Sequence, residues 1–255
     1  MTEHSPSDLQ FYLTAETACP YLPEKYERKL FTHLAGRRAA DLHNMLSVHG
    51  FRRSQNIAYR PACDGCQACQ SARVLVAQFK RNANQRRIWR KNQDIVSTDV
   101  FPHATQEQYL LFKRYLKDRH KNGGMSEMSH LDYEFMVEDT PVQSVVVEYR
   151  ERTPIGEKPG PLLAVALTDI LPDGISMVYS FFDSDLSNRS LGKFMVLDQI
   201  ERARAAGLPH LYLGYWVKNS PKMAYKSSFK PLEVLGNGDH WQLLDEDQTG
   251  SRQVR

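Results

Sequence analysis

A turn formed by Leu171-Pro172-Asp173-Gly174 constrains the fold of this chain more than any other segment. Proline presets φ in such a turn, and glycine tolerates the positive φ that the turn requires. Apolar stretches flank it at 163–170 and 175–182, so the sequence predicts a β-hairpin. A β-branched stretch at 142–149 predicts a strand before it. A helix over 190–206, ended by Gly207, and a strand over 210–216 are predicted after it. This order of strand, hairpin, helix and strand predicts an α+β fold.

Apolar spacing and helix-start signals predict several further elements. Tyr26, Leu30 and Leu34 recur every four residues, which predicts a helix over 24–48. A short apolar stretch at 73–77 predicts a strand, and Thr105 caps a predicted helix that continues to residue 120. Ser220-Pro221 predicts the start of another short helix, because proline is favoured at the first helical position.

Composition places the chain among ordinary globular proteins. Its 255 residues are 41% hydrophobic and 25% charged, and no apolar run reaches the roughly 18 residues of a membrane helix. The first residues lack the basic and then apolar order of a signal peptide. We therefore expect a cytoplasmic protein and exclude membrane, collagen-like and disulfide-rich secreted classes.

Charge is distributed unevenly along the chain. Residues 1–104 contain 15 Lys and Arg against 9 Asp and Glu, whereas residues 105–255 contain 18 against 21. We predict a basic N-terminal module over 1–104, a second domain over 105–240 and a tail over 241–255. Half of the residues at 80–91 are basic, which suits phosphate contact and base stacking by Trp89. The alternative is a solvated helix with Ile88 and Trp89 packed inward. The predicted RNA-contacting side chains are Arg81, Arg86, Arg87, Arg90 and Lys91.

All four cysteines lie in the basic module. Cys63, Cys66 and Cys69 form a C-x2-C-x2-C run, and Cys19 could supply a fourth thiolate. In a reducing compartment such a cluster suits a tetrahedral zinc site or an iron–sulfur cluster. The same pattern also fits buried thiols that pack a loop without metal, or redox chemistry, and the spacing leaves these alternatives open.

Several common catalytic motifs are absent from the sequence. It contains no G-x-G-x-x-G, no G-x-x-x-x-G-K-[ST], no H-E-x-x-H and no G-x-S-x-G. Dinucleotide enzymes, P-loop NTPases, zincins and α/β-hydrolases are therefore disfavoured.

Three segments, taken in order, resemble one protein family. They are Tyr-Arg-Pro-Ala-Cys-x-x-Cys-x-x-Cys at 59–69, the hairpin of 169–183 with Ser-Leu-Gly at 190–192, and Tyr-Leu-Gly-Tyr-Trp at 212–216 followed by Lys-Met-Ala-Tyr-Lys at 222–226. Together they resemble the aminoacyl-tRNA–protein transferases, and among these the bacterial aspartate/glutamate leucyltransferases. The resemblance extends over roughly residues 8–242.

The resemblance implies a GNAT-like acyltransferase fold behind an N-terminal cysteine-containing module. It implies transfer of leucine from leucyl-tRNA to the N-terminal amine of proteins that begin with Asp or Glu. The added leucine would mark the protein for an adaptor and an ATP-dependent protease. The chemistry requires no cofactor, because the aminoacyl ester is already activated.

The resemblance also implies roles for particular residues. Asp183 is a candidate general base and Tyr225 a candidate proton relay or ester ligand, although a capping aspartate and a core tyrosine are equally simple explanations. Arg60 and Lys226 are candidates for binding the acidic acceptor side chain, or for a structural ion pair. The remaining candidate substrate-binding residues are Tyr179, Ser190, Gly192 and Lys222, with Ser190 and Gly192 at a helix N-terminus that could receive a phosphate or the terminal ribose.

Three alternatives remain open at this stage. An arginyl-tRNA–protein transferase would use the same acceptors. An acetyl-CoA N-acetyltransferase would share the fold, but the stretch after Arg189 lacks the second glycine of the usual phosphate loop. A non-catalytic, zinc-dependent RNA-binding module would explain the cysteines and the basic stretch, but it leaves residues 160–230 without a role.

Overall fold

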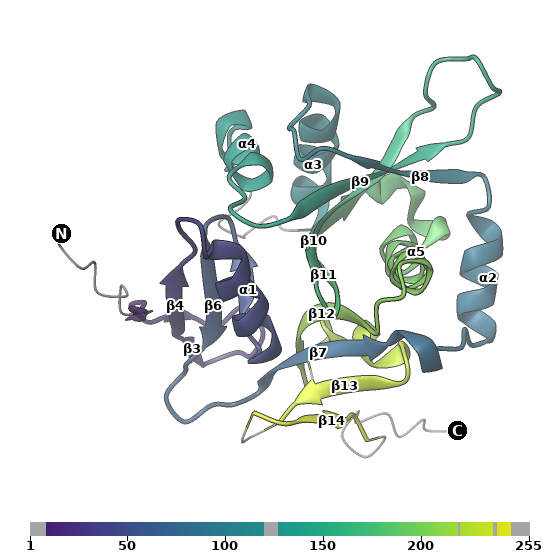
Figure 1. Cartoon of the computed structure of the whole chain (residues 1–255). Helices are drawn as coiled ribbons and strands as arrows, with labels where there is room; N and C mark the ends of the chain where they lie inside the picture. The colour runs from purple at the N-terminus through teal and green to yellow at the C-terminus, as the bar shows by residue number, and fades with distance from the viewer. Residues whose placement is uncertain (1–8, 120–126, 219, 237–238, 246–255) are drawn as a thin grey trace.

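The computed structural model describes residues 9–119, 127–218, 220–236 and 239–245. A small N-terminal sheet lies beside a much larger mixed sheet, and helices cover both faces of the larger one (Figure 1). The predicted mixture of helices and strands is confirmed. Met125, which the sequence suggests as core filler, lies outside the described residues.

The N-terminal part is an antiparallel sheet with one helix packed against it. The sheet order is β1 (Tyr12–Leu13), β4 (Lys29–His33), β6 (Ile57–Pro61) and β5 (Arg52–Ser54). Helix α1 (Ala39–Val48) packs its buried Ala39 and Leu46 against this sheet, and β2 (Thr17–Ala18) pairs separately with β3 (Tyr26–Glu27).

The predicted helix over 24–48 is wrong in its first half. Residues 26–33 form β3 and β4, and only residues 39–48 are helical. Four-residue spacing places Leu30 and Leu34 on one side of a strand as readily as on one face of a helix, since four is also a multiple of two. Gly36 then adopts a φ of 71°, which separates the strand from the helix.

The larger sheet has eight strands. Their spatial order is β14 (Trp241–Leu243), β13 (Leu232–Leu235), β7 (Cys69–Leu75), β12 (His210–Val217), β11 (Gly174–Phe182), β10 (Leu162–Leu171), β9 (Ser144–Glu151) and β8 (Ile95–Val100). The predicted hairpin is confirmed, because Leu171 pairs with Gly174 at the turn between β10 and β11. The sheet draws strands from both sides of the boundary predicted near residue 104, and β14 lies within the predicted tail.

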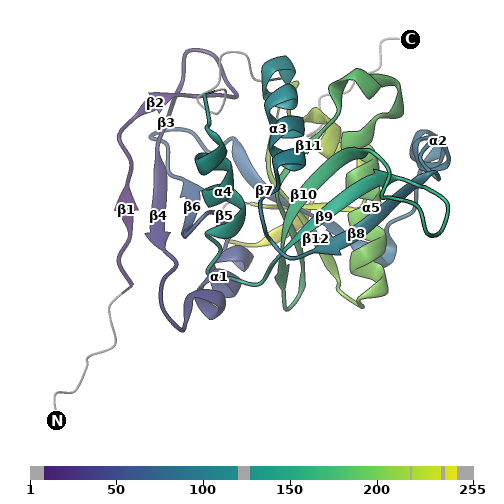
Figure 2. The ribbon, with the colours of Figure 1, turned by 90° about the horizontal axis from the view of Figure 1, so that it is seen from above.

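Helices bury a core on each face of this sheet (Figure 2). On one face lie α5 (Leu191–Ala205) and α2 (Ala83–Lys91), and on the other α3 (Gln106–Arg119) and α4 (His130–Glu138). Short 3-10 turns complete the chain: η1 (Val76–Gln78), η2 (Ser184–Arg189) and η3 (Ala224–Ser228). The last of these replaces the helix predicted from Ser220. None of the helices in the described part of the chain is long and apolar enough to cross a membrane.

Candidate functional site

Strands β11 and β12 begin as neighbours and then part. They are parallel, unlike every other adjacent pair in the eight-stranded sheet, and they pair only over Gly174–Ser176 and His210–Tyr212. Further along, β11 has an irregularity in its register with β10, and β12 has one in its register with β7. Such bulges bend strands and release ladder groups. Beyond Ser176 and Tyr212 a gap opens between the two strands, which we call the parting. Helix α5 starts after β11, so the parting lies at the carboxyl ends of the parallel strands, where open α/β sheets bind ligands.

The side chain of Arg52, from the small N-terminal sheet, enters this parting. Its Nη2 donates to the carbonyls of Met177 at 2.8 Å and Val178 at 3.1 Å, and its Nη1 to that of Leu213 at 3.5 Å. Gly214 makes room for it, because a Cβ at that position would lie 1.1 Å from Nη1 of Arg52. Arg52 therefore satisfies backbone carbonyls of both strands where they separate.

Lys226 adds a second cation beside Arg52. It is only 5% exposed, and its Nζ donates to the carbonyl of Tyr215 at 2.6 Å. Burial, and next the charge of Arg52, hold the pKa of Lys226 well below its ordinary value. Within the described residues, no carboxylate forms an ion pair with Arg52 or Lys226.

Three tyrosines line the same region. The hydroxyl of Tyr179 is buried, and it has no hydrogen-bond partner among the described residues. Burial and then the neighbouring Tyr115 raise the pKa of Tyr179. Burial and Tyr115 also raise the pKa of Tyr225, whereas Arg52 lowers it. Both hydroxyls are thus kept as hydrogen-bond donors at neutral pH.

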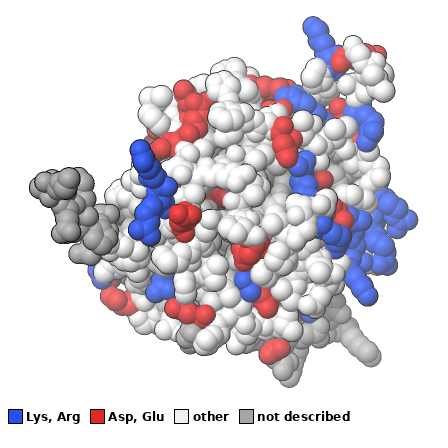
Figure 3. Space-filling model, in the orientation of Figure 1, with Lys and Arg blue, Asp and Glu red and all other residues white. Residues whose placement is uncertain are grey.

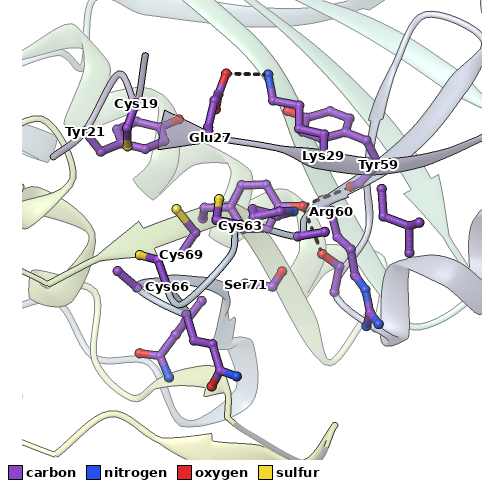
Figure 4. Close-up of a pocket in the computed structure, with 18 of the residues that line it drawn as sticks. Cys19, Tyr21, Glu27, Lys29, Tyr59, Arg60, Cys63, Cys66, Cys69 and Ser71 are labelled. Atoms are coloured by element: carbon purple, nitrogen blue, oxygen red, sulfur yellow. Dashed lines mark hydrogen bonds and ion pairs between the residues drawn. The ribbon is translucent and has the colours of Figure 1, made fainter. Parts of the chain in front are cut away.

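A cavity of about 430 Å³ lies next to this parting, between the N-terminal module and the large sheet. Figure 4 shows the four thiols on its wall, together with Tyr21, Lys29, Tyr59 and Arg60. Tyr215 connects the cavity to the cations. Its hydroxyl donates to the carbonyls of Tyr59 and Gly50, and its ring centroid lies 5.9 Å from Cζ of Arg52.

The thiols lie close enough to influence one another. Burial, followed by the charges of Cys19, Cys63 and Cys66, raises the pKa of Cys69 to about 12. No three His, Cys, Asp or Glu side chains in the described ranges form a group that could hold a metal ion. As placed, the thiols do not fit a metal. We therefore derive no chemical step through one, and the zinc or iron–sulfur group stays a prediction.

Asp183, the candidate base, directly follows strand β11, and its carboxylate already has two partners. It accepts a hydrogen bond from the backbone N–H of Asp185 at 3.1 Å, and its Oδ2 lies 3.6 Å from Nη2 of Arg114. Asp183 therefore caps the turn that follows β11, which is the alternative role that we considered for it. The catalytic role of Asp183 stays a prediction.

The N-terminus of α5 differs in detail from the expectation. Ser190 is the N-cap residue, but it has a φ of 55° and its side chain makes no capping hydrogen bond. Gly192 packs closely against the ring of Phe182, which would lie 3.1 Å from an added Cβ. These two residues border the parting but do not enter it.

Arg60 and Lys222 lie at the cavity side of the site. Arg60 stacks over Phe51 at 5.1 Å and approaches Asp239 at 3.5 Å, so it has an intramolecular carboxylate partner. Lys222 donates to the carbonyl of Pro20 at 3.5 Å, across from the N-terminal module. Of the two predicted carboxylate-binding cations, only Lys226 lacks an acidic partner in the described part of the chain.

Helix α2 presents its basic residues to solvent, away from the parting. Arg86, Arg87, Arg90 and Lys91 are exposed. In Figure 3, Lys and Arg side chains gather on the right, where Figure 1 labels α2. Trp89 instead packs against Phe194 at 5.5 Å, with Arg81 over its ring at 3.8 Å and paired with Glu201. These contacts favour the alternative in which Trp89 packs inward, and base stacking by Trp89 stays a prediction.

Sequence reasoning missed Arg52 and Tyr115. Arg52 and Arg53 are adjacent in a strand, and strand residues alternate between faces. That alternation is a signal that two neighbouring arginines serve different surroundings. Tyr115 of α3 approaches strand β11 because of how the helix packs on the sheet. No local pattern around residue 115 predicts that contact.

Comparison with known proteins covers nearly the whole chain. Residues 17–87 match the model of the arginine-tRNA-protein transferase N terminus, and residues 107–236 match the model of the C terminus. An "Aspartate/glutamate leucyltransferase" of Rhodopseudomonas palustris (strain HaA2) is 52% identical over 96% of both chains. One of Sinorhizobium medicae (strain WSM419) is 57% identical over 92% of both. A crystal structure of FemX aligns with 76% of this chain and 64% of its own, at 11% identity and a TM-score of 0.46.

Proposed function

This chain belongs to the arginine-tRNA-protein transferase family, and we propose that it transfers leucine from leucyl-tRNA to the N-terminal amine of proteins that begin with Asp or Glu. The main support is that relatives 52–57% identical over more than nine-tenths of their length are both named "Aspartate/glutamate leucyltransferase". The basic side chains of Arg52 and Lys226, which bind backbone carbonyls of β11 and β12, support an acidic acceptor.

The proposed reaction requires three things from the protein. It must hold the ester and the amine at near-attack distance, donate hydrogen bonds to the developing oxyanion, and accept a proton. The amine attacks the ester carbonyl, the ester bond to the tRNA ribose breaks, and a peptide bond forms. A protein α-amine has a pKa of about 7.7–8.0, so only a modest base is needed at neutral pH.

We assign these roles to residues around the parting strands. The unpartnered hydroxyl of Tyr179 is our candidate donor to the ester oxygen. Tyr225, whose pKa is raised, is a donor to the ester or a relay rather than a base. Asp183 stays our candidate for accepting the proton, because it directly follows β11, the strand that contains Tyr179.

We propose a GNAT-like fold for the transferase part. The connection from β11 through η2 and α5 to the parallel strand β12 supports it. The N-terminus of α5, with Ser190 and Gly192, would receive a phosphate or the terminal ribose of the tRNA. The exposed side chains of α2 would contact phosphates further along the same molecule.

We further propose that the leucine-bearing product is a degradation signal. An adaptor and an ATP-dependent protease in the cytoplasm would then act on it.

The test is transfer of radiolabelled amino acid from tRNAs charged with leucine, arginine or phenylalanine. The acceptors are peptides that begin with Asp, Glu, Lys or Ala. We expect leucine to be incorporated only into the Asp and Glu peptides. Arginine incorporation would keep the family and overturn the donor, and absence of transfer from every tRNA would overturn the proposed reaction.

A further inference from the structure

Among the described residues, Arg52 and Lys226 lack the carboxylate partner that buried cations normally have. There, Arg52 donates only to backbone carbonyls and Lys226 only to the carbonyl of Tyr215, whose ring centroid lies 5.9 Å from Cζ of Arg52. Buried charges are ordinarily paired, because removing an unpaired ion from water is costly. The side chains that influence Lys226 are Arg52 from β5 and Cys69 from β7, and those that influence Tyr225 are Tyr115 from α3 and Arg52. None of them is a carboxylate.

We propose that Arg52 and Lys226 together bind the side-chain carboxylate of the first residue of the acceptor protein. This assignment rests on the proposed function and deepens it, because it names the residues that would select Asp and Glu. Arg52 is half-buried, so the residue is not sealed from solvent. Both protons of its Nη2 are used by backbone carbonyls, so the guanidinium would offer the carboxylate its charge and a remaining N–H rather than a paired fork, and Lys226 would supply a second point charge.

The burial of Lys226 favours a carboxylate over a nucleic-acid phosphate. Lys226 is 5% exposed and its Nζ is bonded to the carbonyl of Tyr215, so a small terminal group suits it better than a polynucleotide chain. A phosphate of a tRNA chain is flanked on both sides by ribose. The exposed cations that suit such a chain lie on α2, which contacts α5 rather than the N-terminal module.

This arrangement explains discrimination between isosteric acceptors. An acceptor that begins with Asn or Gln has nearly the shape of Asp or Glu, but it would leave both cations without a negative partner. Sites built around a polar contact reject analogues that lack it strongly, since the buried groups are then left unpaired. The same pair would also take up a proton with the acceptor, because an arriving carboxylate favours the charged form of Lys226.

The test compares Arg52→Gln and Lys226→Met with the full-length wild-type protein, using leucyl-tRNA and matched peptides that begin with Asp or Asn. The measured quantity is the ratio of kcat/KM for the two peptides, which does not depend on the fraction of protein that is folded. We expect each substitution to lower this ratio at least tenfold and to leave the KM for leucyl-tRNA within about twofold. Lys158→Gln removes a charge from the exposed loop between β9 and β10 and should leave the ratio unchanged.

Direct binding keeps the inference testable apart from catalysis. Fluorescence anisotropy with labelled Asp and Asn peptides, without tRNA, should show preference for Asp in the wild type and none in either variant. Unchanged ratios and preferences in the variants would overturn the assignment while leaving the transfer reaction intact. A raised KM for leucyl-tRNA with an unchanged ratio would assign the cations to a tRNA phosphate instead. If the wild type transferred no leucine to the Asp peptide, the proposed function itself would fail.

Discussion

Arg52 and Arg53 are consecutive residues of β5, yet their surroundings are opposite. Arg53 is buried, and its Nε and Nη2 each donate to the carboxylate of Asp169 at 2.7 Å. Ser144 contacts the same carboxylate at 2.6 Å, and Nε2 of His43 lies 3.5 Å from it. Arg52, on the other face of the strand, donates only to backbone carbonyls within the described residues, and its Cζ lies 5.9 Å from the ring centroid of Tyr215.

The difference separates a structural charge from a charge available to a ligand. The Arg53–Asp169 pair joins the N-terminal module to strand β10 and is complete within the chain. It also fixes β5, the strand that holds Arg52 in the parting of β11 and β12. We infer that one arginine positions the module and the other faces the substrate, although they are neighbouring residues of the same type in the same strand.

The largest effect should come from breaking the complete pair. Arg53→Met leaves the carboxylate of Asp169 buried without its cation, which typically costs about 3–5 kcal/mol. Urea denaturation followed by circular dichroism measures the loss in free energy of unfolding. The double variant Arg53→Met with Asp169→Leu removes both charges and should recover most of it. A loss below about 1 kcal/mol in the single variant would contradict the structural role.

An intermediate effect is expected from Gly214→Ala. The φ of Gly214 is 75°, and an L-residue in that left-handed region costs about 1–2 kcal/mol. The added methyl would also displace the guanidinium of Arg52, so the preference for Asp over Asn acceptors should fall as it does in Arg52→Gln.

Gly207→Ala provides the matched control for that substitution. Gly207 has a φ of 69°, but nothing lies within 4 Å of an added Cβ. It should lose similar stability and keep the acceptor preference. If both variants kept the preference, Arg52 would not depend on the space at Gly214.

The smallest effect on stability should come from Lys226→Met. The variant loses one hydrogen bond, worth about 1 kcal/mol, but it also removes a cation that burial disfavours. At pH 7 we expect it to match wild-type stability within about 1 kcal/mol or to exceed it. A loss comparable to that of Arg53→Met would erase the distinction between the two cations.

The pH dependence of Lys226→Met sharpens the same prediction. Because the pKa of Lys226 is lower in the folded protein, the unfolded chain binds more protons between that pKa and about 10.4. Wild-type stability should therefore rise relative to the variant as pH increases through this window. Parallel urea titrations at pH 7 and pH 9 measure it, and an unchanged difference would contradict a lowered pKa.

The site was predictable from sequence only where local signals fixed it. The motif at 222–226 led to Lys226 and Tyr225, and the turn at 171–174 fixed the strand that contains Tyr179. Arg60 pairs with Asp239 at 3.5 Å, so its binding of the acceptor carboxylate stays a prediction. No periodicity indicates that Arg52, 174 residues before Lys226, lies next to it.

The sequence by itself determined the hairpin of β10 and β11, the extents of α3 and α5, and the family. Turn chemistry, capping and apolar periodicity act within a few residues, so they can be read along the chain. Only the tertiary structure decided where β11 and β12 part, which arginine enters the gap and which thiols share a cavity. Those features depend on contacts between segments far apart in sequence, and local propensity contains no information about such contacts.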